Sequence, residues 1–89
     1  MLTPVYTTRF EKDVKLAIKR GKDRHKMRTV IGKLIRQEPL EPKYCNHRLK
    51  GTYNTCYKCH LEPDWLLIYR FEGQTIQFIR TGSHADLFR

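Results

Sequence analysis

The first half of the chain has two stretches of helical periodicity. Apolar positions are three or four residues apart in residues 10–18, and they fall at i, i+3, i+4, i+7 and i+8 in residues 27–35, which places each set on one helix face. A capping-box pattern, Thr8-Arg9-Phe10-Glu11, precedes the first stretch, and Asp23 can cap the second. Because the link at residues 21–23 is short, we predict an antiparallel pair of helices.

The second half has the pattern of strands. Dense apolar and aromatic runs too short for typical helices predict a three-stranded antiparallel meander, over residues 55–61, 65–71 and 75–80. Residues 2–6 are expected to form a further short strand, which Pro4 would keep at a sheet edge. The order is strand, two-helix hairpin and meander, which predicts an α+β fold with both helices on one face of the sheet.

Length and composition narrow the class of protein. With 89 residues, the chain has room for one core, because small domains bury little of their surface, so we predict a single domain over 1–89. No apolar run approaches the roughly 20 residues of a membrane span. The first residues have no basic segment followed by an apolar one, so we expect no signal peptide and a cytoplasmic location.

The charge is strongly positive and unevenly distributed. The chain has a net charge of +9, with 18 basic and 9 acidic side chains. Residues 1–50 carry 14 basic and 5 acidic side chains, whereas the second half carries 4 of each. Most of the surplus falls on the polar faces of the two predicted helices, which indicates a polyanionic partner such as nucleic acid, or a solubilising face.

Three cysteines raise two metal-related alternatives. The segment Cys56-Tyr57-Lys58-Cys59-His60 has the form of a c-type haem attachment motif, and Cys45 could complete a zinc ligand set with it. Haem attachment requires export, for which the sequence offers no signal. In a regular strand Cys56 and Cys59 point to opposite faces because their spacing is odd. We therefore predict free thiols, with no metal and no cofactor.

Titratable side chains gather at one end of the predicted meander. His60 and Asp64 flank the turn between its first two strands, and Arg80 and His84 lie at and beyond the end of its third. Those positions meet at one edge of an antiparallel sheet, with His47 in the preceding loop. Arg80 shares the parity of Ile76 and Phe78, so we expect these three side chains on one face, where Arg80 needs a site or an ionic partner such as Asp64.

Such a set suits cleavage of RNA. One imidazole can accept a proton while another donates one, and the adjacent 2′-hydroxyl of RNA is itself the nucleophile. An arginine can stabilise the charge on the phosphorane, and aromatic rings such as Trp65, Tyr69 and Phe88 can stack on bases. A non-catalytic basic nucleic-acid-binding module and a zinc-binding protein remain alternatives, since strand-end histidines and tryptophans are often structural.

Three segments of the chain resemble one family. They are His47-Arg48-Leu49-Lys50-Gly51, then residues 59–69 with the sequence CHLEPDWLLIY, and then residues 80–88 with the sequence RTGSHADLF. Together with the helix start at residues 10–15, they resemble the YafQ branch of the RelE-type toxins, which are bacterial mRNA interferases of type II toxin–antitoxin systems. Asn46 and Arg48 depart from the family pattern around the first histidine.

The resemblance implies a fold, an activity and partners. The fold is microbial-ribonuclease-like, and the activity is metal-free cleavage of mRNA in the ribosomal A site through a 2′,3′-cyclic phosphate, which inhibits translation. The implied partner is a DinJ-type antitoxin, which would bring the toxin to operator DNA. The basic helices would contact rRNA phosphates or the antitoxin.

The resemblance also implies roles for individual residues. His84 is the expected general acid, and His60 and Asp64 are expected to activate or orient the 2′-hydroxyl, with help from His47. Arg80 is expected to stabilise the scissile phosphate. The expected substrate-binding residues are Trp65, Phe88 and Lys50, of which the two aromatic residues would shape the base pocket and hold His84 in place.

Overall fold

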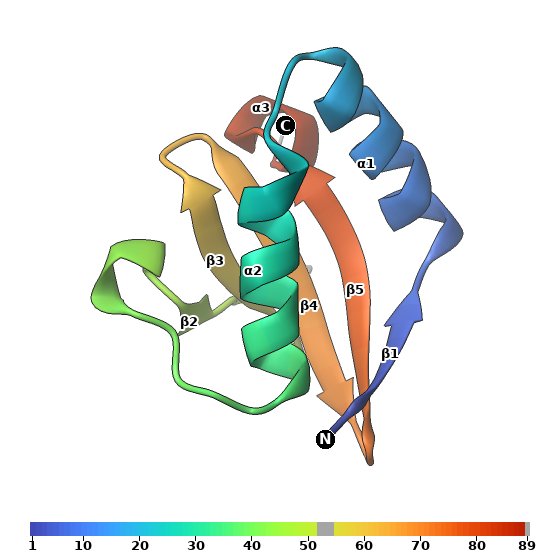
Figure 1. Ribbon diagram of the computed structural model, residues 1–89, viewed down its shortest axis with the longest axis vertical. Helices are drawn as coiled ribbons and strands as arrows, with labels where there is room; N and C mark the ends of the chain where they lie inside the picture. The colour runs from blue at the N-terminus through green and yellow to red at the C-terminus, as the bar shows by residue number, and fades with distance from the viewer. Residues whose placement is uncertain (52–54, 89) are drawn as a thin grey trace.

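The computed structural model describes residues 1–51 and 55–88 and has the predicted order of elements (Figure 1). These elements are β1 (Thr3–Tyr6), α1 (Thr8–Lys19), α2 (Arg24–Ile35), the 3-10 turn η1 (Pro42–Tyr44), β2 (His47–Arg48), β3 (Tyr57–Glu62), β4 (Trp65–Glu72), β5 (Thr75–Gly82) and α3 (His84–Leu87). The sequence pattern did not predict β2, η1 or α3, because a strand of two residues and helices of three and four residues show no periodicity.

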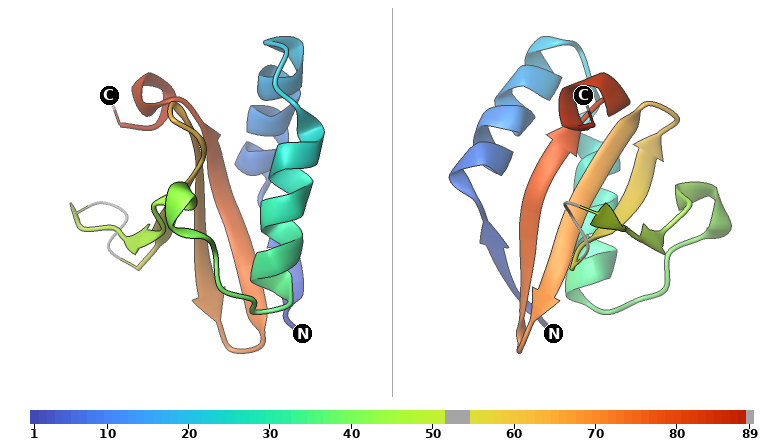
Figure 2. Two further views of the ribbon diagram at one scale, coloured as in Figure 1. Left: turned by 60° about the vertical axis from the view of Figure 1, so that its left-hand side comes forward. Right: turned by 180° about the vertical axis from the view of Figure 1, so that it is seen from behind.

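One five-stranded sheet carries these elements, in the order β1-β5-β4-β3-β2. The meander β3-β4-β5 is antiparallel, as predicted, and β1 joins β5 in parallel at the edge. Parallel pairing requires a crossover between the two strands, and the helical pair supplies it. Figure 2 shows α1 and α2 together on one side of the sheet and α3 on the other. We call these two sides the helix face and the open face.

The helix starts differ slightly from prediction. The cap of α1 is Thr7 rather than Thr8: its Oγ1 accepts a hydrogen bond from the Phe10 amide at 3.0 Å and donates one to the Ile79 carbonyl at 3.0 Å. The same side chain therefore starts the helix and ties it to β5. Asp23 caps α2 as predicted, by accepting from the His25 amide at 2.9 Å.

Both faces of the sheet carry apolar clusters. The main core lies on the helix face, where side chains of both helices cover those of the central strands, Trp65, Leu67, Tyr69 and Phe78 among them. A smaller cluster on the open face consists of Cys56, Leu66, Ile68 and Leu87. Because Cys59 belongs to the main core and Cys56 to the smaller one, the two thiols lie on opposite faces, as their odd spacing predicts. Burial raises the pKa of the Cys59 thiol to about 12.

A β-bulge in β5 changes the face on which its last residues lie. Tyr69 pairs with Phe78, whereas Ile68 pairs with Arg80, so Ile79 is the extra residue. Arg80 therefore stands opposite Ile68, a residue of the open-face cluster. The prediction that Arg80 shares a face with Phe78 is wrong, because strict alternation ends at the bulge.

The basic side chains of the helices lie largely in solvent. Lys12, Lys15, Lys19, Arg24 and Arg28 are exposed, and among the described residues no carboxylate pairs with them. They belong to α1 and α2, which lie on the side of the sheet opposite α3 (Figure 2). Within residues 1–51 and 55–88, no helix is long and apolar enough to cross a membrane.

Candidate active site

Three basic side chains of β2 and β3 share the open face. Lys58 and His60 are two residues apart on β3, which places them on one side of the strand. His47 of β2 is the register partner of Lys58, and paired residues of neighbouring strands also share a side. Lys58 in turn pairs with Ile68 of the open-face cluster. His47, Lys58 and His60 therefore gather on the face that α1 and α2 leave uncovered.

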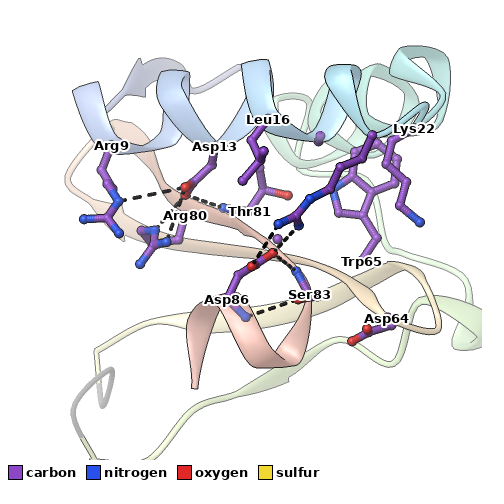
Figure 3. A pocket seen from close by; sticks show the side chains of 13 residues that line it. Arg9, Asp13, Leu16, Lys22, Asp64, Trp65, Arg80, Thr81, Ser83 and Asp86 are labelled. Carbon is purple, nitrogen blue, oxygen red and sulfur yellow. Dashed lines mark hydrogen bonds and ion pairs between the residues drawn. The ribbon is translucent and has the colours of Figure 1, made fainter. Parts of the chain in front are cut away.

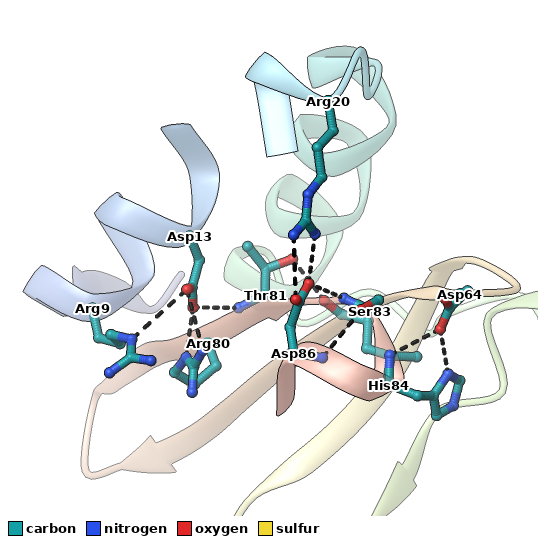
Figure 4. Close-up of polar contacts among 10 residues, drawn as sticks. Arg9, Asp13, Arg20, Asp64, Arg80, Thr81, Ser83, His84 and Asp86 are labelled. Atoms are coloured by element: carbon teal, nitrogen blue, oxygen red, sulfur yellow. Dashed lines mark hydrogen bonds and ion pairs between the residues drawn. The ribbon is translucent and has the colours of Figure 1, made fainter. Parts of the chain in front are cut away.

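The short helix α3 brings a second imidazole to this face. Its cap is a reciprocal capping box, in which the Ser83 hydroxyl accepts from the Asp86 amide at 3.1 Å and the Asp86 carboxylate accepts from the Ser83 amide at 2.9 Å. Arg20, just after α1, donates to the same carboxylate at 2.7 Å (Figure 4). Leu87 packs into the open-face cluster. These contacts position His84, the first residue of α3.

His84 is held by Asp64. One carboxylate oxygen of Asp64 accepts from the His84 backbone amide at 2.8 Å and lies 2.6 Å from the imidazole Nδ1. Both hydrogen bonds lower the pKa of Asp64, the backbone bond more than the imidazole bond, so the carboxylate is ionised near neutral pH. An ionised acceptor at Nδ1 keeps a proton on that nitrogen, and Nε2 is left to exchange protons with a substrate.

The imidazole of His60 lies beside that of His84. Their ring centroids are 5.7 Å apart, with the planes inclined at 63°. Burial lowers the pKa of His60, and the positive charges of Lys58, His84 and His47 lower it further, although a hydrogen bond with the Pro63 backbone opposes the shift. His60 is therefore neutral near pH 7. A neutral imidazole next to one backed by a carboxylate is an arrangement suited to accepting and donating protons within one small site.

An aromatic ring and a cation border the two imidazoles. The Phe88 ring is 6.4 Å from that of His84, centroid to centroid, and the Lys58 Nζ lies 5.5 Å from the Phe88 ring centroid. Phe88 is 41% exposed, so part of its ring is accessible to a ligand. Phe88 thus lies beside His84, where the resemblance implies that it holds the imidazole and shapes a base pocket.

The structure brings His47 to the edge of the site, and Lys50 follows two residues after β2. Both side chains are exposed, and His47 Nδ1 lies 3.0 Å from the Cys45 carbonyl oxygen. Cys45 has a left-handed backbone with φ of 46°, which turns the chain from η1 into β2. His47 contributes to the electrostatics of His60, as its effect on the pKa of that residue indicates.

Arg80 has a different partner from the one considered in the sequence. Its Nε donates to the Asp13 carboxylate of α1 at 2.6 Å, and both side chains are largely buried. The same carboxylate accepts from the Thr81 amide at 3.1 Å. Asp13 thus caps the edge of β5 beyond the end of β1 and fixes the Arg80 guanidinium there, whereas Asp64 serves His84.

Trp65 lies in the main core and not on the open face. Its side chain is 1% exposed, and its indole Nε1 has no hydrogen-bond partner among the described residues. The expectation that Trp65 stacks on a base is therefore corrected, because a buried ring has no free face. Tyr69, also 1% exposed, is corrected in the same way. Trp65 borders a cavity of about 180 Å³ between α1, β5 and α3, which Arg20 and Asp86 also line (Figure 3).

Two side chains at the site were missed in the sequence. The only feature of the sequence that points to Lys58 is its position two residues before His60. This is weak evidence, because alternate residues of any strand lie on the same side. Asp13 had no signal, because its contact with Arg80 spans 67 positions in the sequence. Among residues 1–51 and 55–88, no group of three or more histidine, cysteine or carboxylate side chains is arranged to hold a metal ion.

Comparisons with known proteins agree on one family. The family model described as bacterial toxin of type II toxin–antitoxin system, YafQ, matches residues 2–89. The mRNA interferase toxin YafQ of Escherichia coli strain K12 is 43% identical over 84 residues, which cover 93% of this chain and 91% of that protein. The crystal structure of YafQ from E. coli strain BL21(DE3) is 39% identical, with a TM-score of 0.94 and complete coverage of both chains. YafQ in the E. coli DinJ–YafQ complex is 40% identical, with a TM-score of 0.92 and 100% coverage of both chains. The chain therefore belongs to the YafQ family of bacterial toxins of type II toxin–antitoxin systems.

Proposed function

We propose that this toxin is an endoribonuclease that cleaves mRNA in the A site of the translating ribosome, by metal-free acid–base catalysis, and so inhibits translation. The observation that carries the proposal is the pair His60 and His84. Their rings are 5.7 Å apart, and their surroundings differ: basic groups face His60, whereas the Asp64 carboxylate binds His84. Two imidazoles that differ in this way can divide the two proton transfers of the reaction.

The proposed reaction uses the RNA's own nucleophile. Neutral His60 removes the proton of a 2′-hydroxyl, whose oxygen then attacks the adjacent phosphorus. The bond from phosphorus to the 5′-oxygen breaks, and protonated His84 gives its Nε2 proton to that oxygen. The products are a 2′,3′-cyclic phosphate and a 5′-hydroxyl, so no water, metal ion or protein nucleophile takes part in the first step.

The geometry leads us to divide the supporting roles differently from the resemblance. Because Asp64 binds His84, we propose that it orients and stabilises the general acid instead of activating the 2′-hydroxyl. Phe88, exposed beside His84, contacts a base of the substrate, and Lys50 contacts its backbone. His47 adds positive charge next to His60. Arg80, fixed by Asp13, contributes positive charge from the sheet edge.

Ribosome dependence fits the shape and charge of the molecule. The histidines lie on the face that α1 and α2 leave uncovered. Because no helix covers this face, the histidine side chains alone would hold a single-stranded RNA in position only weakly. The basic helices occupy the opposite side. We propose that they contact rRNA phosphates, while the ribosome presents the mRNA codon to the histidines. The place of action is then the translating ribosome of the cytoplasm.

The proposed protein partner is a DinJ-type antitoxin. A related toxin was crystallised in a DinJ–YafQ complex. The net charge of +9 in the present chain favours an acidic binding segment in its partner. Operator DNA would be reached only through the antitoxin.

An in vitro translation reaction with one defined mRNA tests the proposal. Wild-type toxin and His84→Ala are added separately, new 5′ ends are mapped by primer extension, and naked mRNA is treated in parallel. We expect cuts in phase with codons, only on translating ribosomes, and none with the variant. Binding of wild-type toxin to ribosomes without any cut would instead support a non-catalytic basic module.

A further inference from the structure

Lys58 occupies a central position on the open face. It lies on β3 two residues before His60, and its register partners are His47 on one side and Ile68 on the other. Its Nζ lies 5.5 Å from the centroid of the Phe88 ring, which in turn lies next to His84. The ammonium group therefore lies on the same face as the imidazoles of His47 and His60 and beside the aromatic ring at the end of α3.

The charge of Lys58 is available to a ligand. Among the described residues no carboxylate pairs with it, although nine ion pairs are present there. Arg80, by contrast, donates to Asp13 through both Nε and a terminal nitrogen, at 2.6 and 3.3 Å. A cation without a carboxylate partner, next to two imidazoles, is favourable for an anionic substrate.

We propose that Lys58 contacts the scissile phosphate and stabilises the negative charge that develops on its non-bridging oxygens during cleavage. The inference rests on the proposed ribonuclease function and assigns to Lys58 the electrostatic role that the resemblance implies for Arg80. A positive charge aimed at developing phosphorane charge acts more strongly in the transition state than in the ground state, which is the condition for catalysis.

Lys58 also acts on the proposed general base. The charges that act on His60 come from Lys58 on β3, His47 on β2 and His84 on α3, with Asp64 bound to His84. The groove on the other side of His60 is also lined by titratable or charged side chains, which are Asp23, His25, Lys26, Lys43 and Glu62. Among these groups, Lys58 exerts the largest effect in lowering the pKa of His60, after burial. Removal of the ammonium group should thus both slow cleavage and let His60 gain a proton at higher pH.

Single-turnover cleavage on programmed ribosomes, with saturating toxin, tests the inference. The variants are Lys58→Gln and Lys58→Arg, with Arg70→Gln as a charge-matched control at the other end of the sheet. We expect Lys58→Gln to lower the rate about 10- to 100-fold, Lys58→Arg to recover most of it, and Arg70→Gln to leave it unchanged. The acid limb of the pH–rate profile should move to higher pH in Lys58→Gln alone.

A double-mutant cycle separates phosphate contact from mere support of Phe88. If Lys58 acted only by holding the aromatic ring, Lys58→Gln would have no further effect in a Phe88→Ala background. We expect the rate to fall further there. A folded Lys58→Gln variant that cleaves at the wild-type rate would overturn the inference while leaving the ribonuclease function intact. Failure of the wild-type toxin to cleave would instead overturn the proposed function itself.

Discussion

Leu87 is the apolar anchor of α3, and its truncation should uncouple the catalytic helix from the sheet. The side chain is 7% exposed and packs in the small open-face cluster. Leucine-to-alanine changes in cores cost about 2–5 kcal/mol, and a cluster this small places Leu87→Ala near the low end, at about 2–3 kcal/mol. A domain stability of about 5–15 kcal/mol leaves the fold intact. The expected fall in Tm is about 10–20 °C.

The effect on cleavage should be larger than the effect on the fold. A four-residue helix does not persist by itself. Without Leu87, only polar contacts remain to hold it: the capping box, the exposed pair of Arg20 with Asp86, and the exposed contacts of Asp64 with His84. His84 would then leave its place beside His60 for much of the time. We expect cleavage at 25 °C to approach the residual level of His84→Ala.

Leu34→Ala is the matched control for this prediction. Leu34 is 5% exposed, but it belongs to α2 and packs in the main core, on the face away from the open-face histidines. Thermal unfolding followed by circular dichroism should show a comparable or larger loss of Tm, whereas cleavage by the folded protein should stay within about twofold of wild type. If Leu87→Ala lost stability as expected but kept the wild-type rate, the reasoning that α3 positions the general acid would be refuted.

Three further predictions concern the acid, metal ions and the basic helices. Asp64→Asn should slow cleavage about 10- to 100-fold, because the His84 imidazole loses the carboxylate that orients it; a folded variant that cleaves at the wild-type rate would count against the pairing. Toxin treated with EDTA and dialysed should retain its full single-turnover rate on ribosomes kept at constant Mg²⁺, and restoration of a lost rate by added Zn²⁺ or Cu²⁺ would contradict metal-free catalysis. Affinity for ribosomes, measured by pelleting, should fall about 100-fold between 50 and 200 mM salt if about four phosphates are contacted. The double variant Lys12→Gln with Lys15→Gln should make the affinity less dependent on salt. An affinity that does not change with salt would exclude the helices as the docking surface.

The elements that could be predicted from the sequence are those with long periodic patterns. The stripe of residues 27–35 and the apolar run of residues 65–71 correspond to α2 and β4. Both patterns arise from burial against the same core, so local sequence and tertiary packing agree. The helix order, the antiparallel meander and the edge position of β1 followed from these patterns and short connections.

What could not be predicted depends on contacts between distant residues. The bulge at Ile79 is not encoded in a local pattern, yet it moves Arg80 off the face of Phe78. The capture of Arg80 by Asp13 depends on how α1 packs over the edge of β5. Trp65 was assigned to a base pocket through its place in a motif, whereas burial decides its role. The proximity of His60 and His84 could be predicted because the strands of a meander reverse direction one after another. The end of the first strand and the end of the third therefore lie at the same end of the sheet.

The most direct test of the histidine pair is the pH dependence of single-turnover cleavage on programmed ribosomes. Because the pKa of His60 is lowered, the base should stay neutral, and the rate should persist, as pH falls to values below the ordinary histidine pKa of about 6.5. Protonation of His60 then ends activity on the acid side. We therefore expect a profile whose acid midpoint lies below about pH 6.5 and whose acid limb is absent in His60→Ala. A flat profile from the wild-type toxin, or an acid limb that survives in His60→Ala, would contradict the proposed acid–base mechanism.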